Sequence, residues 1–277
     1  MEYSEKVANH YAHGKLLTAI EAGLIAQGIS AQNASVEDLA PVDEFHIGGR
    51  IATAHFLDQL EIEPSQSILD IGCGLGGSAR YAAKTYGAKI TGVDLTPEYV
   101  ETGQALCDWV GLSDRIQLHQ GSALSLPFEA NSFDTAFMIH VGMNIQNKRS
   151  LVAEVSRVLK PRAKFGIYDI MKTGHEQPTY PVPWASTSDT SWLAAPSEYR
   201  AAFQDNGFDI VAENNRHEFA NEFFKKAKAS IEAAGGPPPL GLHVLMQQLS
   251  VEKISNMVAA LVKNRISPIE MIAIKGD

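Results

Sequence analysis

The spacing of apolar positions divides the chain into segments of different kinds. Between residues 4 and 28, apolar side chains recur at helical spacing and Gly28 supplies a stop, which predicts one or two leading helices. From residue 66, short apolar runs alternate with amphipathic stretches, the pattern of a parallel sheet with crossover helices on its faces. The predicted strands are 67–71, 89–93, 116–119, 135–139 and 164–169, and the predicted helices lie near 76–86, 97–110 and 147–159, the last closed by Lys160 and Pro161.

The pattern becomes less regular beyond residue 170. Residues 177–184 are rich in proline, which offers no backbone donor to a sheet, so we expect a loop that faces a pocket. Helices are predicted at 196–206, 219–234 and 244–262, and strands at 208–212 and 267–274. The simplest division is an N-terminal helical cap (1–60), a cofactor-binding core (61–218), a helical insert or lid (219–262) and a final core strand (263–277).

Composition and charge narrow the function classes. Lys and Arg total 23 against 32 Asp and Glu, a formal charge of −9, so neutralisation of a nucleic-acid backbone is not expected. No apolar stretch approaches the roughly 20 residues of a membrane span, and the first residues lack a secretory pattern, which predicts a cytoplasmic protein. The positions of Cys73 and Cys107 indicate free thiols. The sequence contains no set of zinc ligands, so no metal is expected. A homodimer is possible.

A glycine-rich loop carries the clearest chemical signal. Residues 68–77 follow a predicted buried strand and open a helix, and Gly72, Gly74 and Gly77 match the G-x-G-x-x-G spacing of a dinucleotide loop. Asp94 ends the next strand, where an acid binds a ribose. Asp70 lies two residues before the first glycine, where it repels a pyrophosphate but attracts the sulfonium and ammonium groups of S-adenosylmethionine. The sequence therefore favours S-adenosylmethionine as cofactor.

Several segments resemble, in order and spacing, the class I S-adenosylmethionine-dependent methyltransferases: residues 68–80, 91–95, 121–128, 132–134 and 154–161. The resemblance implies an α/β fold, a doubly wound Rossmann-like sheet of seven strands whose last strand, at 269–274, runs antiparallel, with N-terminal helices and a helical insert near 219–262. Two departures are Ser122, where the family commonly has an acid, and Arg162, where it commonly has glycine after Pro161, which implies a different turn. The expected cofactor-binding residues are Asp70, Gly72, Cys73, Gly74, Gly76, Asp94, Leu95, Ser122, Ala123 and His140, with Gly49 and Arg50 near the donor's carboxylate.

Three further segments, 45–50, 139–144 and 180–185, resemble the branch that contains sarcosine/dimethylglycine and phosphoethanolamine N-methyltransferases. The resemblance implies a small-molecule amine as acceptor. In the phosphoethanolamine enzymes an acid and a histidine form a catalytic pair, but His140 and Asn144 occupy the corresponding positions here, so phosphoethanolamine is not the expected substrate.

The candidate catalytic residues are His140, which could accept a proton near neutral pH, Tyr11, which resembles the tyrosine that covers the donor in these relatives, and His46. Asn144, Tyr180 and Trp184 are candidate substrate-binding residues, since aromatic faces attract an ammonium group. The alternative for each of these residues is a purely structural role in packing.

Four functions remain open at this point. They are methylation of a small amine such as sarcosine or dimethylglycine, O- or C-methylation of a larger metabolite held under residues 219–262, NAD-dependent oxidation, and ligand binding without catalysis.

Overall fold

The computed structural model describes residues 3–277, apart from the side chains of Tyr3 and Gln248, and is built around one seven-stranded sheet of order β3-β2-β1-β4-β5-β7-β6. The neighbouring pairs among β1 to β5 are parallel, and β7 runs antiparallel to both β5 and β6. The expected doubly wound α/β fold is confirmed. The strands are β1 (Ser67–Ile71), β2 (Lys89–Asp94), β3 (Ile116–Gln120), β4 (Phe133–Ile139), β5 (Leu159–Lys172), β6 (Phe208–Asn215) and β7 (Ile266–Lys275).

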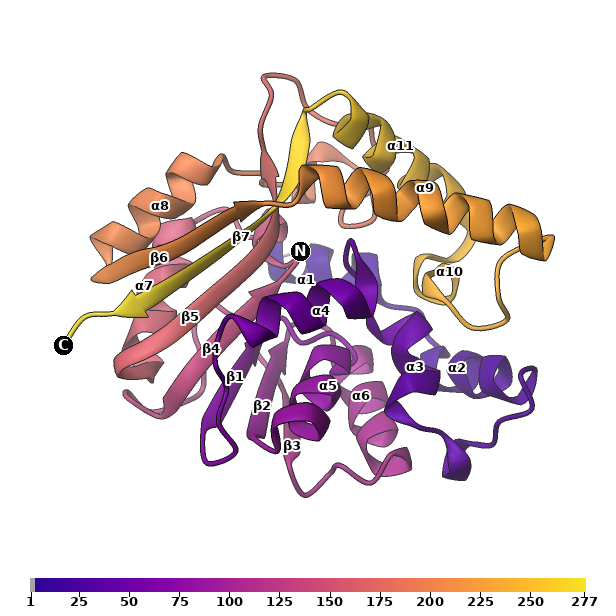
Figure 1. The fold of residues 1–277 in the computed structure, drawn as a ribbon, viewed down its shortest axis with the longest axis horizontal. Helices are drawn as coiled ribbons and strands as arrows, with labels where there is room; N and C mark the ends of the chain where they lie inside the picture. The colour runs from indigo at the N-terminus through magenta and orange to yellow at the C-terminus, as the bar shows by residue number, and fades with distance from the viewer. Residues whose placement is uncertain (1–2) are drawn as a thin grey trace.

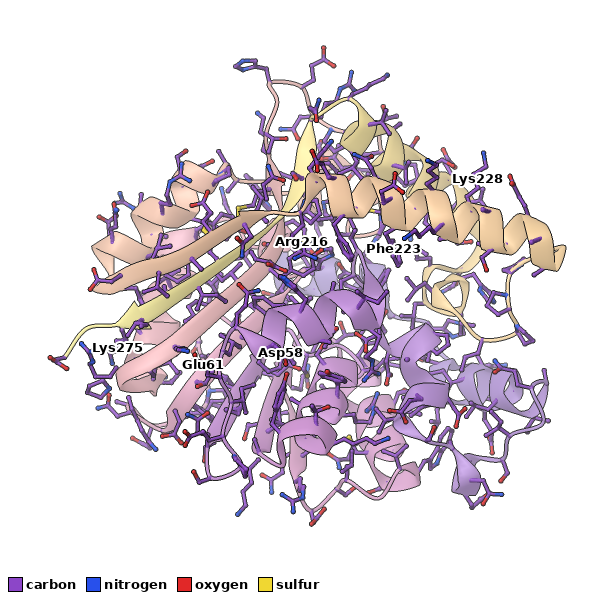
Figure 2. All side chains as sticks on the ribbon, viewed as in Figure 1. Asp58, Glu61, Arg216, Phe223, Lys228 and Lys275 are labelled. Atoms are coloured by element: carbon purple, nitrogen blue, oxygen red, sulfur yellow. The ribbon has the colours of Figure 1, made fainter. Side chains whose placement is uncertain are left out.

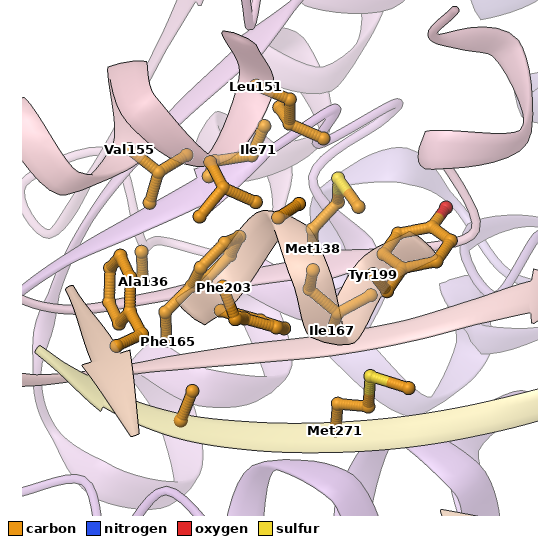
Figure 3. Close-up of a cluster of buried hydrophobic side chains, with 14 of the residues drawn as sticks. Ile71, Ala136, Met138, Leu151, Val155, Phe165, Ile167, Tyr199, Phe203 and Met271 are labelled. Atoms are coloured by element: carbon orange, nitrogen blue, oxygen red, sulfur yellow. The ribbon is translucent and has the colours of Figure 1, made fainter. Parts of the chain in front are cut away.

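Helices cover both faces of the sheet (Figure 1) because the buried strands are apolar on both sides. In β4, Ala136 and Met138 pack toward one face and Phe137 toward the other. The first face carries the aromatic cluster of Phe165 and Phe203 (Figure 3). That face is covered by α7 (Lys148–Val158) and α8 (Pro196–Asp205), and the opposite face by α4 (Gly49–Asp58), α5 (Gly77–Tyr86) and α6 (Pro97–Trp109).

The leading segment forms helices, as predicted, and is attached to the sheet layer through α6. Glu98 at the start of α6 accepts backbone hydrogen bonds from His13, Gly14 and Leu16, which fixes the turn between the first two helices. The N-terminal elements are α1 (Tyr3–Tyr11), α2 (Leu16–Ile25), η1 (Ala31–Asn33) and α3 (Val36–Asp43).

The insert near 219–262 lies at the carboxyl edge of the sheet, where α9 (His217–Ala234) extends away from the sheet as the longest helix of the described chain (Figure 1). The predicted single helix over 244–262 is wrong. The segment divides into α10 (Leu242–Met246), η4 (Gln247–Leu249) and α11 (Ser250–Val262), because Gln247 has a left-handed φ of 56° that an α-helix cannot contain.

Pro161 does not close a helix as predicted. Helix α7 already ends at Val158, and Pro161 lies within β5, where the register with β4 shifts. Arg162 after it has a φ of 66°, so this arginine adopts the left-handed conformation that glycine reaches more easily. Within residues 3–277 we find no helix both long and apolar enough to span a membrane.

Candidate functional site

A cavity opens at the carboxyl ends of β1, β2 and β4, the edge where open α/β sheets bind their ligands. Asp70 from β1, Asp94 from β2 and His140, which follows β4, all line it. Helices α1 and α3 contribute Tyr11 and Asp43 from the other side. The topology thus assembles one site from segments that are far apart in the chain.

The floor of the first cavity is the glycine loop after β1. Gly72 has a φ of 68°, and a Cβ there would lie 2.3 Å from Cγ2 of Val141, so a larger residue is excluded by both backbone and packing. The Gly72 N–H donates to the carbonyl of Val93 at 2.7 Å, which holds the loop against β2. The backbone is thereby exposed to a ligand without an intervening side chain.

Two carboxylates in this cavity differ in their partners. Asp94 accepts hydrogen bonds from the backbone N–H groups of Gly74 (2.9 Å) and Thr96 (2.8 Å). Oδ2 of Asp70 is buried without a hydrogen-bond partner among the described residues. The pKa of Asp70 is raised well above its usual range, mainly because the carboxyl is buried and further because the charges of Asp94 and Glu44 are close. A cation in the cavity would supply the missing partner.

His46 is held by a short chain of hydrogen bonds. The hydroxyl of Thr53 lies 2.6 Å from Oε2 of Glu44, to which it donates, and 2.9 Å from Nε2 of His46. Nε2 also lies 3.2 Å from the carbonyl oxygen of Gly49, which can only accept, so Nε2 carries the hydrogen of the neutral ring and Nδ1 is its proton acceptor. Arg50 pairs with Glu44 at 2.7 Å and completes the chain.

The two imidazoles are neighbours, with ring centroids of His46 and His140 5.8 Å apart. Burial lowers the pKa of His46 to about 4. Burial and the nearby His46 lower the pKa of His140 well below its usual value, and Nε2 of His140 has no hydrogen-bond partner within the described chain. Both rings are therefore neutral at pH 7, with lone pairs able to accept a proton.

Asn144, in η2 (Gly142–Asn144), connects the N-terminal helix to the proline-rich loop. Its Oδ1 accepts a hydrogen bond from the Tyr11 hydroxyl at 2.9 Å, and its Nδ2 donates to the carbonyls of Trp184 and Thr190 at 2.8 Å. The amide thereby fixes the position of Tyr11 at the cavity wall.

A second cavity, partly open to solvent, adjoins the first. Tyr11, Phe45, His46 and His140 line both cavities, so these four side chains form the junction between them. Its remaining lining is apolar and includes Trp184 of the proline-rich loop.

The chain is similar to known methyltransferases over the strands that form the first cavity. Residues 69–167 match the family model described as a methyltransferase domain. Sterol 4-C-methyltransferase of Caenorhabditis elegans is 39% identical over 119 residues, 43% of this chain and 35% of that protein. The aligned part of the chain spans about a third of the length of the curated relatives that match at this level.

Residues 69–167 are thus similar to the methyltransferase domain of these relatives. Two of the solved structures that share the fold of this chain illustrate the range of its neighbours. A protein of Galdieria sulphuraria described as a sarcosine dimethylglycine methyltransferase is 18% identical with a TM-score of 0.65, covering 85% of this chain and 94% of that one. Geranyl diphosphate C-methyltransferase of Streptomyces coelicolor A3(2) is 16% identical with a TM-score of 0.71, covering 99% and 98%.

The first cavity brings together most of the residues singled out from the sequence. Its lining contains Tyr11, His46, Asp70, Gly72, Cys73, Gly74, Asp94, Leu95, Ala123, His140 and Asn144.

Six of the expected residues lie outside the lining of the first cavity; one of them, Trp184, lines the second, and the other five line neither. Arg50 pairs with Glu44 and stacks on Tyr81, 4.8 Å from the ring centroid. The Ser122 hydroxyl accepts the N–H of Leu124 at 3.2 Å. The five residues are Gly49, Arg50, Gly76, Ser122 and Tyr180.

Sequence patterns missed Glu44 and Thr53, although both flank His46. The sequence did carry a signal for Thr53, because it follows Gly49 by four positions and so lies one helical turn into α4, on the same face. Asp43 was also missed; the residue lines the cavity, and its carboxylate forms a buried pair with Arg80, Oδ1 to Nη2, at 2.5 Å. No pattern pointed to that partner, which lies on α5. Among residues 3–277, no group of three or more His, Cys, Asp or Glu is arranged to hold a metal ion.

Proposed function

We propose that this chain transfers a methyl group from S-adenosylmethionine to a small-molecule acceptor. The observation that carries the proposal is the unpartnered, buried carboxyl of Asp70 in a cavity at the carboxyl edge of the sheet. When bound, S-adenosylmethionine supplies an electrophilic methyl on a cationic sulfur. Asp70 would face the positive charges of that donor, and Asp94 would accept hydrogen bonds from its ribose hydroxyls.

A nicotinamide dinucleotide is a weaker fit to the same cavity. Asp43, Asp70 and Asp94 are the acidic residues of the described lining, which contains no lysine or arginine. Asp43 is offset by Arg80 and Asp70 has no cationic partner, so the described lining offers no cationic side chain to a pyrophosphate brought to this loop. The charge of the lining thus favours a cationic ligand over an anionic one.

The residues of the chain would act mainly by alignment, exclusion of water and acceptance of a proton. Methyl transfer to an O–H, N–H or C–H group forms the bond to the methyl, releases the neutral thioether and leaves one proton to be removed. His140 and His46 lie at the junction of the cavities and are neutral. We propose that one of them takes this proton, with His46 held in position by Thr53 and Glu44.

Two acceptor classes are compatible with this proposal. The sequence resemblance points to a small amine such as sarcosine or dimethylglycine. An O- or C-methyl acceptor of larger size is the second candidate, favoured by the second cavity beneath the helical insert.

Calorimetric titration of the purified chain with S-adenosylhomocysteine and with NAD tests the donor. Selective binding of S-adenosylhomocysteine is expected, and selective binding of NAD would refute the proposal. Mass spectrometry of a metabolite extract incubated with isotopically labelled S-adenosylmethionine then tests transfer. Label in a metabolite, absent with heat-inactivated protein, would name the acceptor.

A further inference from the structure

The second cavity lies between the proline-rich loop and the three helices of the insert. Phe223 and Phe224 reach it from α9, Leu242 and Met246 from α10, and Met257 from α11. Figure 2 shows Phe223 on the side of α9 that faces the N-terminal helices, whereas Lys228 projects from the opposite side. On α9 the apolar Phe223 thus lies on the cavity side and the charged Lys228 on the opposite side.

The charge of this lining distinguishes it from the first cavity. Among its described residues there is no Asp, Glu, Lys or Arg, and the titratable groups are Tyr11, His46 and His140. Burial keeps both histidines neutral at pH 7. A carboxylate or phosphate placed here would lose its hydration without gaining an ionic partner, which is costly.

The shape of the lining fits a bulky apolar molecule. Aromatic rings from Phe45, Phe223 and Phe224 offer flat faces, and the thioethers of Met246 and Met257 adapt to irregular shapes. Ring-sized or branched hydrocarbon skeletons bury more apolar surface here than a three-carbon amino acid can.

The junction provides the contact with the donor. Tyr11, Phe45, His46 and His140 belong to both linings, so a molecule in the second cavity can present one atom toward the first. The polar groups of the second cavity lie at this junction, which would orient an acceptor with its reactive atom inward and its skeleton outward toward α9.

We propose that the second cavity is the acceptor site and takes an uncharged, predominantly apolar metabolite with an aromatic or isoprenoid skeleton and one methyl-accepting group. The inference rests on the proposed methyltransferase function and refines it. It disfavours sarcosine and dimethylglycine, because their carboxylate has no cationic partner among the described residues of the lining.

Thermal unfolding in saturating S-adenosylhomocysteine tests this proposal with 2-naphthol and geraniol as neutral probes and dimethylglycine as the charged one. At least one neutral probe should raise the melting temperature in a concentration-dependent manner, and dimethylglycine should not. Stabilisation by dimethylglycine alone, or by none of the three, would overturn the acceptor class. The stabilisation by S-adenosylhomocysteine itself reports separately on the proposed function.

Phe223→Asp places a carboxylate in the cavity from a partly exposed position on α9. It should weaken binding of the neutral probe at least tenfold while leaving binding of S-adenosylhomocysteine within twofold. Ile231→Asp is the matched control, because Ile231 is exposed on the same helix and outside the lining. Equal effects of the two substitutions on the neutral probe would place the binding site elsewhere.

Discussion

The hydroxyl of Thr53 stands between Glu44 and His46, 2.6 Å from Oε2 of the first and 2.9 Å from Nε2 of the second. The relationship fixes which nitrogen of His46 carries the proton, since the single hydroxyl hydrogen is given to the carboxylate. It also links the site to Arg50, whose guanidinium neutralises Glu44 rather than lining the first cavity.

Replacement of Thr53 tests the role of this chain of hydrogen bonds. Thr53→Val should lower the rate of methyl transfer about tenfold at pH 7, because Glu44 no longer positions the His46 ring, whereas Thr53→Ser should restore most of the rate. Single-turnover kinetics across pH 6–9 provide the measurement. An equal loss in the serine variant would assign the defect to packing, and an unchanged rate in Thr53→Val would remove His46 from proton transfer.

Asp70→Asn should change cofactor affinity and stability in opposite directions. The neutral amide cannot offset the charge of a cationic donor. A hydrogen bond to a charged group contributes ~1.5–3 kcal/mol, so its loss should raise the dissociation constant for S-adenosylmethionine about 10- to 100-fold. The unliganded protein should unfold at the same or a higher temperature, because an unpartnered buried carboxyl is removed. Calorimetry and thermal melts measure both.

The control for this experiment is Asp209→Asn, which removes an exposed carboxylate from β6. It should leave the affinity unaltered. Wild-type affinity in Asp70→Asn would contradict the assigned role of Asp70.

Stability should depend on pH through His46. Its pKa is about 4 in the folded chain, below the usual 6.5, so the unfolded chain binds more protons between these values. Stability attributable to His46 is therefore complete above pH 6.5 and is lost as the pH falls toward 4, by about 3 kcal/mol in total. Urea unfolding of wild type and His46→Gln at pH 7.5, 6 and 5 should show a shallower decline in the variant, and parallel declines would exclude this origin.

The glycine loop should tolerate no side chain at its first position. Gly72→Ala adds a Cβ at a φ of 68° and within 2.3 Å of Val141, whereas Gly111→Ala adds one at a φ of 67° with nothing within 4 Å. The second substitution measures backbone strain alone, about 1–2 kcal/mol. The first should cost a further ~1–3 kcal/mol of overpacking. Denaturant unfolding compares the two, and equal costs would show that Val141 yields without penalty.

Tyr11→Phe removes the hydroxyl that donates to Oδ1 of Asn144. The affinity for S-adenosylhomocysteine should fall about fivefold, since a bond of ~1 kcal/mol no longer fixes Tyr11 at the cavity wall. Limited proteolysis of the N-terminal region should become faster. Unchanged affinity together with unchanged proteolysis would mean that this hydrogen bond does not fix the wall.

Apolar periodicity located the seven strands and the order of elements because a parallel strand buried on both faces leaves a continuous apolar run in the chain. It failed at Gln247, where a local left-handed backbone interrupts an otherwise helical pattern. The glycine loop and the role of Asp70 could also be predicted from the sequence, since the residues that indicate them lie within ten positions of the chain.

The sequence by itself thus determined a doubly wound sheet with a loop suited to a cationic donor, because both depend on short-range spacing. Only the tertiary structure decided that Thr53 holds His46, that Arg50 pairs with Glu44, and that Phe223 and Met257 meet around one cavity. Those contacts join separate elements, and the packing of the elements, which no local pattern records, sets which side chains face each other.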